Sequence, residues 1–181
     1  VIVFDANACP ASANILVNEP TEILASLSTI DVLCNGSSTG RITVNSVSGS
    51  AGNPYSYYWS NSYTGIINQN LSAGVYYVTV TSDGDGCSST FTETITEPTV
   101  ISGSLNATDI SVTGANDGII SANISGGQGS YSYVWSGPNG FSSSSPSSIN
   151  GLIYGVYTLV VTDGNGCTKN FTTVINEPNC N

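Results

Sequence analysis

The sequence predicts an all-β fold, built from tandem two-sheet antiparallel sandwiches that are arranged end to end. Three observations support this prediction. The chain has no helical hydrophobic period, and its short apolar runs are separated by turns of Gly, Asn and Ser. A cysteine is followed eleven positions later by the proline of a Glu-Pro pair at 9 and 20, at 87 and 98, and at 167 and 178. The prolines are 78 (98 − 20) and 80 (178 − 98) residues apart, which indicates repeats of domain size.

The repeated motif also predicts where the domains begin and end. The predicted segments are the last hairpin of a preceding repeat (residues 1–20), repeat one (residues 21–98), repeat two (residues 99–178) and the start of a following segment (residues 179–181). Pro20, Pro98 and Pro178 mark the boundaries, because proline cannot donate to a β-ladder and restricts the residue before it. Only one or two residues then precede the next predicted strand, so we expect short, stiff linkers.

Each repeat is predicted to contain seven short strands, with a turn every 8 to 12 residues. In repeat one these strands are residues 22–28, 31–33, 41–47, 55–60, 65–68, 75–82 and 88–96. In repeat two they are residues 100–105, 110–112, 119–124, 131–136, 141–144, 156–162 and 168–176. Two sheets of three or four such strands make a sandwich of immunoglobulin-like type.

Two aromatic motifs strengthen this prediction. The sequences Tyr-Ser-Tyr-Tyr-Trp59 and Tyr-Ser-Tyr-Val-Trp135 place a Trp and two Tyr on one face of a strand, because side chains alternate between faces. The sequences Leu-x-x-Gly-x-Tyr76 and Leu-x-x-Gly-x-Tyr157 are typical of a tyrosine corner, in which the hydroxyl bonds to the preceding backbone. We therefore expect the two Trp to fill the cores and the two Tyr to fix the corners.

The composition excludes several classes of function. Two basic residues stand against twelve acidic ones, the net charge is −10 and there is no His. Nucleic acid is not expected as a partner, because phosphate binding needs clustered Lys and Arg. Direct membrane insertion is not expected either, since no apolar run reaches about 18 residues. An enzyme is not expected, because without His no His-based triad or His metal ligand exists.

Five cysteines indicate an oxidising compartment and leave two pairings open. Cys34 and Cys87 are the only pair within one repeat, so a bond between them is the first hypothesis. A simple sandwich, however, places Cys34 at the pole opposite Cys87. The same topology brings Cys34 towards Cys167 of the next repeat, which makes a bond between repeats the alternative.

Acidic turns near the repeat boundaries are candidate calcium ligands. The turns that contain Asp83, Asp85 and Asp163 could donate oxygens to Ca²⁺, and Glu19 and Glu97 could face them across the boundaries. The simpler interpretation is a plain hairpin turn, because Asp-Gly and Asn-Gly supply the positive φ that tight turns need. Apart from this candidate calcium site, no cofactor is expected.

Taken together, the motifs resemble a known family. They are Cys34-Asn-Gly-Ser-Ser-Thr-Gly40, Tyr-x-Tyr-x-Trp59, Leu-x-x-Gly-x-Tyr76, Asp-Gly-x-Gly-Cys87 and the closing Glu-Pro. The chain resembles the SprB-type repeats of giant cell-surface adhesins of gliding Bacteroidota. Repeat two departs from the pattern, because Val112 stands at the family's first cysteine position.

The resemblance implies secretion through the type IX system, display on the bacterial cell surface, and a stalk or filament role in attachment or gliding motility. The implied partners are neighbouring repeats of the same polypeptide, with surface glycans or other cells as targets. One alternative is a pair of carbohydrate-binding accessory domains of a secreted enzyme. Another is a filament subunit in which residues 1–20 complete an adjacent subunit by strand addition.

Overall fold

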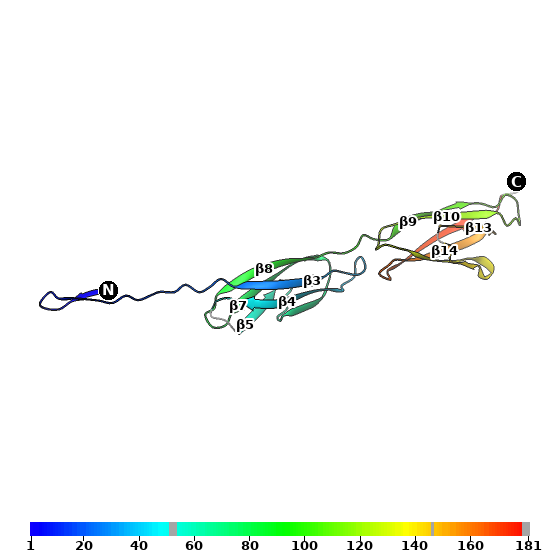
Figure 1. Ribbon diagram of the computed structural model, residues 1–181. Helices are drawn as coiled ribbons and strands as arrows, with labels where there is room; N and C mark the ends of the chain where they lie inside the picture. Colours follow the sequence, from blue (N-terminus) through cyan, green and yellow to red (C-terminus); the bar gives the residue numbers. More distant parts are fainter. Residues whose placement is uncertain (51–53, 146, 179–181) are drawn as a thin grey trace. The chain divides into compact units, whose positions relative to one another are not determined.

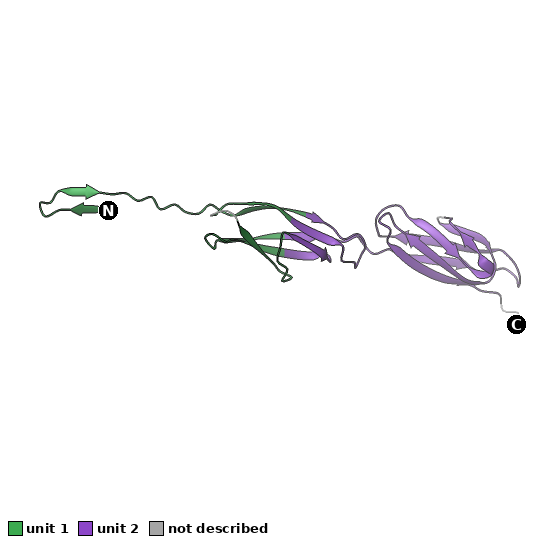
Figure 2. Cartoon of the chain, turned by 90° about the horizontal axis from the view of Figure 1, so that it is seen from below, with its two compact units in different colours: residues 1–28, 44–66, 77–92 green, residues 29–43, 67–76, 93–181 purple. Residues whose placement is uncertain are grey.

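The computed structural model describes residues 1–50, 54–145 and 147–178. The predicted following segment, residues 179–181, lies outside these residues. Two compact units divide the chain, as coloured in Figure 2. Unit 1 contains residues 1–28, 44–66 and 77–92, and unit 2 contains residues 29–43, 67–76 and 93–181.

Strands account for nearly all of the regular structure. In the described residues the only helical element is a 3-10 turn, η1 (Pro138–Gly140). No helix there is long and apolar enough to cross a membrane. The strands are β1 (Ile2–Phe4), β2 (Pro10–Ser12), β3 (Leu24–Ile30), β4 (Gly40–Ser48), β5 (Tyr55–Trp59), β6 (Ile67–Leu71), β7 (Gly74–Ser82), β8 (Ser88–Ile95), β9 (Ser102–Thr108), β10 (Gly118–Ser125), β11 (Ser132–Ser136), β12 (Ser142–Ser143), β13 (Ser148–Leu152), β14 (Gly155–Thr162) and β15 (Thr168–Ile175).

Repeat two forms a complete sandwich within unit 2. One sheet has the order β13-β10-β9 and the other β12-β11-β14-β15, and neighbouring strands in both sheets run antiparallel (Figure 1). Ile120, Trp135 and Leu159 are fully buried between the sheets. A three-stranded and a four-stranded antiparallel sheet around a buried Trp confirm the predicted all-β, immunoglobulin-like sandwich.

Alternation along β14 shows why this strand forms where it does. Tyr157, Leu159 and Val161 are buried, whereas Val156 on the opposite face of the strand is 56% exposed. A strand with this period-two pattern covers the core with one face and meets water with the other. β14 also pairs with β15 along its whole length, from Gly155 opposite Ile175 to Thr162 opposite Thr168.

Repeat one has sheets with the orders β3-β4-β6 and β5-β7-β8. Its strands β3, β4, β7 and β8 each run from one unit into the other. In unit 1, Trp59, Val78 and Val80 are fully buried. In unit 2, Ile42 and Ile95 are buried as well. The predicted boundaries at residues 20, 98 and 178 differ from this division and remain predictions.

The predicted short strands at 31–33 and 110–112 are wrong, because both segments are irregular and end in a bend. In each segment one backbone N–H group donates to a side-chain oxygen and not to a neighbouring strand. The Leu33 N–H donates to Thr39 Oγ1 at 2.9 Å, and the equivalent Ser111 N–H donates to Asp117 Oδ1 at 3.0 Å. A local side-chain acceptor offers the backbone an alternative to a sheet ladder.

The prediction for repeat two also missed β13. Ile149 and Leu152 are both buried although they are three positions apart, so this strand lacks the period of two. The cause is an irregularity in the β10–β13 pairing between Gly118 and Ile120, next to Gly151 with φ of 67°. An extra residue in one strand lets two side chains three apart face the same side.

The segment between β8 and β9 is longer than predicted. Residues 96–101 separate Ile95 from Ser102, and three of them, 99–101, follow Pro98 where one or two were expected before the next strand. Hydrogen bonds hold the segment instead. The Thr96 N–H donates to Asp31 Oδ1 at 2.7 Å, and the Thr99 carbonyl accepts the Gly127 N–H at 2.8 Å. Ile101 is buried in the core of repeat two.

Residues 1–20 contain the predicted hairpin, β1 paired with β2, from Ile2 opposite Ser12 to Phe4 opposite Pro10. Its turn is closed by Asp5, whose Oδ1 accepts the N–H groups of Asn7 at 2.8 Å and Cys9 at 2.9 Å. The assignment of this hairpin to a preceding repeat stays a prediction.

Candidate functional site

A disulfide joins Cys34 to Cys167, with a Cα–Cα distance of 5.6 Å and a sequence separation of 133. Both cysteines belong to unit 2. Cys34 lies in the turn between β3 and β4, and Cys167 lies in the hairpin between β14 and β15. The structure therefore contains the pairing that the sequence analysis gave as the alternative, Cys34 with Cys167. The first hypothesis, Cys34 with Cys87, is wrong, since Cys87 is a free, exposed cysteine.

Strand length explains why Cys34 does not pair with Cys87. Cys87 precedes β8, whose eight residues span about 26 Å. Thr96 follows β8, and its carbonyl accepts the N–H of Val32, two residues from Cys34, at 3.0 Å. A disulfide needs Cα atoms no more than about 7 Å apart, so a full strand between them prevents the bond.

Hydrogen bonds surround the disulfide. The Asn165 amide nitrogen, Nδ2, donates to the Leu33 carbonyl at 2.8 Å, across 132 residues of sequence. The Asn35 amide nitrogen donates to the Pro98 carbonyl at 3.0 Å. The Gly36 N–H donates to Glu97 Oε2 at 2.6 Å. The turn that carries Cys34 is thus fixed both to the Glu-Pro pair and to the turn that carries Cys167.

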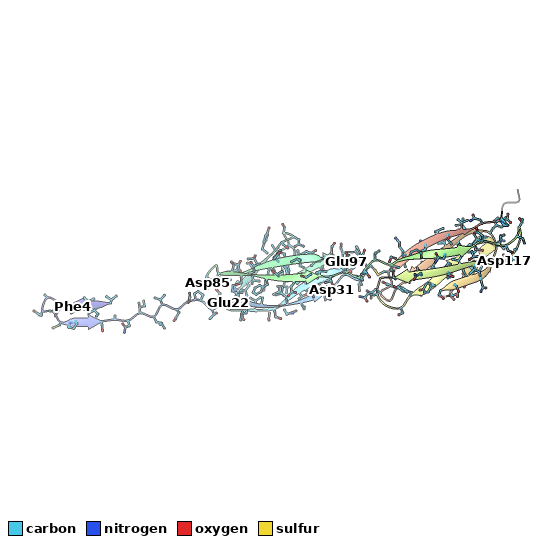
Figure 3. The ribbon with its side chains drawn as sticks, turned by 90° about the horizontal axis from the view of Figure 1, so that it is seen from above. Phe4, Glu22, Asp31, Asp85, Glu97 and Asp117 are labelled. Carbon is cyan, nitrogen blue, oxygen red and sulfur yellow. A yellow bond between two sulfur atoms is a disulfide. The ribbon has the colours of Figure 1, made fainter. Side chains whose placement is uncertain are left out.

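Asp31 also holds the segment after β8, because its carboxylate accepts the Thr96 N–H. Asp31 and Glu97 lie at the same end of the strands of repeat one (Figure 3). The hydrogen bond from Thr96 to the Asp31 carboxylate lowers the pKa of this carboxyl, because it favours the charged form. In repeat two the equivalent carboxylate accepts the matching hydrogen bond, since the Asn176 N–H donates to Asp109 Oδ1 at 2.8 Å.

A cavity of about 140 Å³ lies beside the disulfide within unit 2. Its walls combine polar and apolar groups from both repeats, among them Asn35, Pro98, Ile101, Asp163 and Lys169. The space is far smaller than a pocket for a drug-sized ligand, which starts near 300 Å³. It fits a few water molecules and not an extended substrate.

Asp163 organises the turn that holds Cys167. Its Oδ1 accepts the N–H groups of Asn165 at 3.0 Å and Cys167 at 2.9 Å, and its Oδ2 accepts the N–H of Gln128 at 2.9 Å. Asp163 is only 6% exposed. The bond from Gln128, followed by those from the turn, lowers the pKa of Asp163 and outweighs the raising effect of burial.

Two other candidate calcium ligands, Asp83 and Asp85, also accept hydrogen bonds from the protein. Asp83 Oδ1 accepts the Ser56 hydroxyl at 2.6 Å, and Asp85 Oδ2 accepts the Ser50 hydroxyl at 2.5 Å. Glu19 is exposed in the segment after β2. The described ranges, with gaps at 51–53, 146 and 179–181, contain no group of three or more His, Cys, Asp or Glu placed to hold a metal ion.

The tyrosine corners form as the spacing predicts. The Tyr76 hydroxyl donates to the Ser72 carbonyl, and the Tyr157 hydroxyl donates to the Ile153 carbonyl, both at 3.1 Å. Tyr157 is 1% exposed and packs edge-on against Phe141, with ring centroids 5.5 Å apart. Tyr76 is only half-buried. Repeat two therefore covers its corner more completely than repeat one.

Both predicted core Trp side chains are fully buried. Trp59 Nε1 donates to the Gly65 carbonyl at 2.8 Å, and Trp135 Nε1 donates to the Ser145 carbonyl at 2.9 Å. A buried indole N–H needs an acceptor, and here a backbone carbonyl supplies it in each repeat.

Sequence reasoning missed the polar residues around the disulfide. Asn165, Asn35 and Asp31 each make a side-chain bond to backbone more than 60 residues away. Only Asp31 could have been found from the sequence, because an Asp also stands at the equivalent position 109 of repeat two. Nothing in a single sequence marks the two Asn side chains among the many that the chain contains.

The sequence and the fold are both similar to those of known proteins. The sequence profile of the SprB repeat matches residues 26–64 and 104–140. No curated relative matches the sequence. Among solved structures, three domains of the bacteriophage RB49 outer capsid protein Hoc are 17% identical, with 85% of this chain and 59% of that chain covered and a TM-score of 0.48. This chain therefore spans less than two thirds of that structure.

Two further solved structures are similar at low identity. The amphioxus IgVJ-C2 molecule is 14% identical, with 82% of this chain and 95% of that chain covered and a TM-score of 0.36. The ectodomain of mouse nectin-like molecule 4 is 11% identical, with 86% and 65% covered and a TM-score of 0.37. The SprB matches fall once in each predicted repeat, on the strands and turns described above. Residues 26–64 and 104–140 thus match the SprB repeat, which is consistent with a SprB-type repeat region.

Proposed function

We propose that this chain is a structural stalk or filament segment of a secreted bacterial surface adhesin, used in attachment or gliding motility. The Cys34–Cys167 disulfide is the observation that carries the proposal, because it closes a loop of 133 residues. When the two ends of the chain are pulled, tension passes through the two sulfur atoms and bypasses the strands between them. A segment that must keep its length under load needs such a bypass.

The chemistry of the chain supports an extracellular location. SprB repeats suggest a cell-surface protein, and a disulfide persists in an oxidising environment. We infer that the chain lies outside the outer membrane after export through the type IX system. Labelling of intact cells with an antibody against the chain tests the location, and signal that requires cell lysis would contradict it.

The proposal includes the partners. Repeats follow one another end to end in the same polypeptide, and surface glycans or other cells are bound elsewhere along it. The charge of −10 disfavours nucleic acid and anionic membrane surfaces. The absence of His from the sequence disfavours most acid–base and nucleophilic catalysis, so the role is structural and not enzymatic.

Attachment under flow tests the function. Cells that display the parent protein with Cys34 and Cys167 both changed to Ser should attach normally in still medium and detach at lower shear than cells with the unchanged protein. A matched control is the Val112→Ser variant, which changes the position in repeat two that is equivalent to Cys34 and leaves the Cys34–Cys167 bond in place. Equal detachment of all three strains would contradict a load-bearing role for the disulfide.

A second candidate function, carbohydrate binding, is favoured by exposed aromatic side chains in unit 1. Tyr58 is 59% exposed and Tyr77 is 49% exposed. Tyr58 pairs with Thr79, two positions from Tyr77, so both rings lie on the solvent face of neighbouring strands β5 and β7. Such rings can stack on sugars.

Glycan-array binding tests this candidate. A Tyr58→Ala, Tyr77→Ala chain should lose any glycan binding that the unchanged chain has. The control is Val134→Ala in β11, which removes an apolar side chain that is 53% exposed in repeat two. Absence of binding by the unchanged chain would reject the candidate.

Strand addition is a third candidate, favoured by the exposed apolar side chains of residues 1–20. Val1 and Val3 are 84% and 61% exposed, whereas Leu159 and Val161 at the equivalent positions of repeat two are fully buried. A hairpin that displays core side chains can complete a sandwich in another subunit. Light scattering tests this: polymers that disappear when residues 1–20 are deleted would support it, and a monomer at high concentration would reject it.

A further inference from the structure

We propose that Cys87 is a second disulfide site, whose partner is a cysteine in the first turn of a SprB-type repeat placed N-terminal to repeat one. The bond would repeat the Cys34–Cys167 linkage one repeat earlier. It extends the proposed function, since a row of such bonds would carry load through successive repeats. Its test is biochemical and stands apart from the attachment assay.

The first observation is the position of Cys87. Cys87 lies in the hairpin between β7 and β8, as Cys167 lies in the hairpin between β14 and β15. In both hairpins an Asp stands four positions before the cysteine. Cys87 is exposed and carries a free thiol, whereas Cys167 is bonded to Cys34 of the repeat before it. Cys167 shows that a cysteine at this position forms a disulfide when the preceding repeat has a cysteine in the turn between its first two strands.

The second observation is that the backbone that leads into each repeat is the same. The Gly127 N–H donates to the Thr99 carbonyl at 2.8 Å, and the Ser50 N–H donates to the Thr21 carbonyl at 2.7 Å. Both Thr residues directly follow a Glu-Pro pair. A repeat that ends in Glu-Pro can therefore precede repeat one with the same local geometry that precedes repeat two.

Two glycines show how closely the first segments of the two repeats agree. A Cβ atom on Gly126 would lie 2.0 Å from the Val100 carbonyl oxygen, and a Cβ atom on Gly49 would lie 1.9 Å from the Glu22 carbonyl oxygen. The hydroxyls of Tyr131 and Tyr55 donate to the carbonyls of these two glycines. The same close approach and the same tyrosine bond occur beside both cysteine-bearing hairpins.

The chain also contains its own exception. Repeat two has Val112 where repeat one has Cys34, and Val112 is 62% exposed. A repeat of this kind cannot bond to the repeat after it. A disulfide between two successive repeats should therefore form only when the upstream repeat has a cysteine at this position. Repeat one has Cys34 there and can bond to the repeat after it, whereas repeat two has Val112 and cannot.

One difference between the hairpins affects the strength of the bond. Asn165 donates its amide to the Leu33 carbonyl beside the disulfide, and Asp85 stands at the equivalent position in repeat one. A carboxylate has no proton to donate at neutral pH. The Cys87 bond should therefore be reduced more easily than the Cys34–Cys167 bond, and Asp85→Asn should narrow the difference.

Formation of the bond needs an oxidant, for which a low-molecular-weight disulfide is sufficient. A cysteine thiolate attacks one sulfur of the oxidant, which forms a mixed disulfide and releases one thiolate. The second cysteine then attacks the mixed disulfide and releases the other thiolate. Two protein thiols become one disulfide, and one small disulfide becomes two thiols.

The test uses the full chain with a second copy of residues 21–98 inserted after Pro20. Cys9, Cys180 and the upstream copy of Cys87 are changed to Ser, so four cysteines remain. Ser37→Thr in the upstream copy gives its Cys34 peptide a mass different from that of the downstream copy. After refolding in oxidised and reduced glutathione, free thiols are counted and an unreduced digest is analysed by mass spectrometry. We expect no free thiol, and peptides that join the upstream Cys34 to Cys87 and the downstream Cys34 to Cys167.

The matched control inserts residues 99–178 instead, with its own Cys167 changed to Ser. Val112 then occupies the upstream turn, so Cys87 should remain free while the Cys34–Cys167 peptide forms. Val112→Cys in that inserted copy should restore the bond to Cys87. In all arrays the Cys34–Cys167 peptide reports that the junction has folded.

Three results would overturn the proposal. Cys87 could stay free in the first array while Cys34–Cys167 forms. Cys87 could instead pair with the Cys34 of its own repeat. Loss of the Cys34–Cys167 peptide from every array, the unmodified chain included, would remove the geometric basis of the proposal. The attachment assay under flow is unaffected by the first two results, so the proposed function is judged separately.

Discussion

At the scale of single residues, the acidic turn before each cysteine illustrates how one side chain fixes a hairpin. Asp5 and Asp163 each accept the N–H groups two and four positions later. In repeat one the equivalent turn is wider, because the Ser82 N–H donates to the Cys87 carbonyl and Asp83 bonds to Ser56. The same spacing of residue types therefore gives two different turns.

Acidification should weaken the turn that Asp163 organises. Its pKa is lowered in the folded state, so its contribution to stability is complete above the unfolded value of about 4 and is lost as the pH falls through the folded-state pKa. We expect Asp163→Asn to lower the melting temperature at pH 6, and the difference from the unchanged chain to shrink towards pH 2. A difference that is constant over this range would contradict the account.

The two tyrosine corners offer a matched pair of substitutions. Tyr157→Phe leaves the Ile153 carbonyl without its donor in a buried site, which should cost about 1 to 2 kcal/mol of unfolding free energy. Tyr76→Phe should cost less than about 0.5 kcal/mol, because Ser72 is exposed and water can reach its carbonyl. Urea denaturation measures both, and equal costs would show that burial does not decide the value of the bond.

At the scale of elements, the loop between β10 and β11 depends on one close approach. Gly126 has φ of 81° and its Cβ would overlap the Val100 carbonyl, whereas Gly129 has φ of 70° and no atom within 4 Å of its Cβ. Gly126→Ala should therefore cost about 3 kcal/mol or more, and Gly129→Ala only about 1 kcal/mol from the left-handed backbone. Thermal unfolding of the two variants tests this, and similar melting temperatures would argue against the packing of this loop.

Individual strands also differ in how well the sequence predicts them. β14 and β15 were predictable because their alternation is regular and their turn residues are strong signals. β13 was not, because a bulge near Gly151 breaks the period of two. The segments 31–33 and 110–112 were mistaken for strands, since the side chains of Thr39 and Asp117, several residues away, accept backbone N–H groups that a strand would donate to a neighbouring strand.

The candidate site was predictable only in part, for a related reason. The topology of a sandwich was sufficient to bring Cys34 and Cys167 together as an alternative to Cys34 and Cys87. The bonds of Asn165 and Asn35 depend on how two turns meet, and a local pattern does not encode such a meeting. The acidic residues were selected as calcium ligands because they stand in turns and at Glu-Pro pairs near the predicted repeat boundaries. Asp83, Asp85, Asp163 and Glu97 instead accept hydrogen bonds from the protein.

At the scale of the whole molecule, the disulfide should raise the stability of the chain. A bond that closes a loop of 133 residues is expected to contribute up to roughly 5 kcal/mol, chiefly by restricting the unfolded chain. Calorimetry of the oxidised chain and of the Cys34→Ser, Cys167→Ser variant should show a lower melting temperature for the variant. Cys87→Ser is the control and should leave the melting temperature unchanged, since Cys87 is free in this chain.

The most direct test of the load path is to stretch single molecules by their two ends, with and without a reductant. The disulfide holds Cα atoms that are 133 residues apart at 5.6 Å, so the oxidised chain should withhold about 45 nm of extensible length. Reduction should release this length, and the Cys34→Ser, Cys167→Ser variant should show it without reductant. Equal total extensions of the oxidised and reduced chains would contradict the proposal that tension passes from repeat to repeat through Cys34 and Cys167.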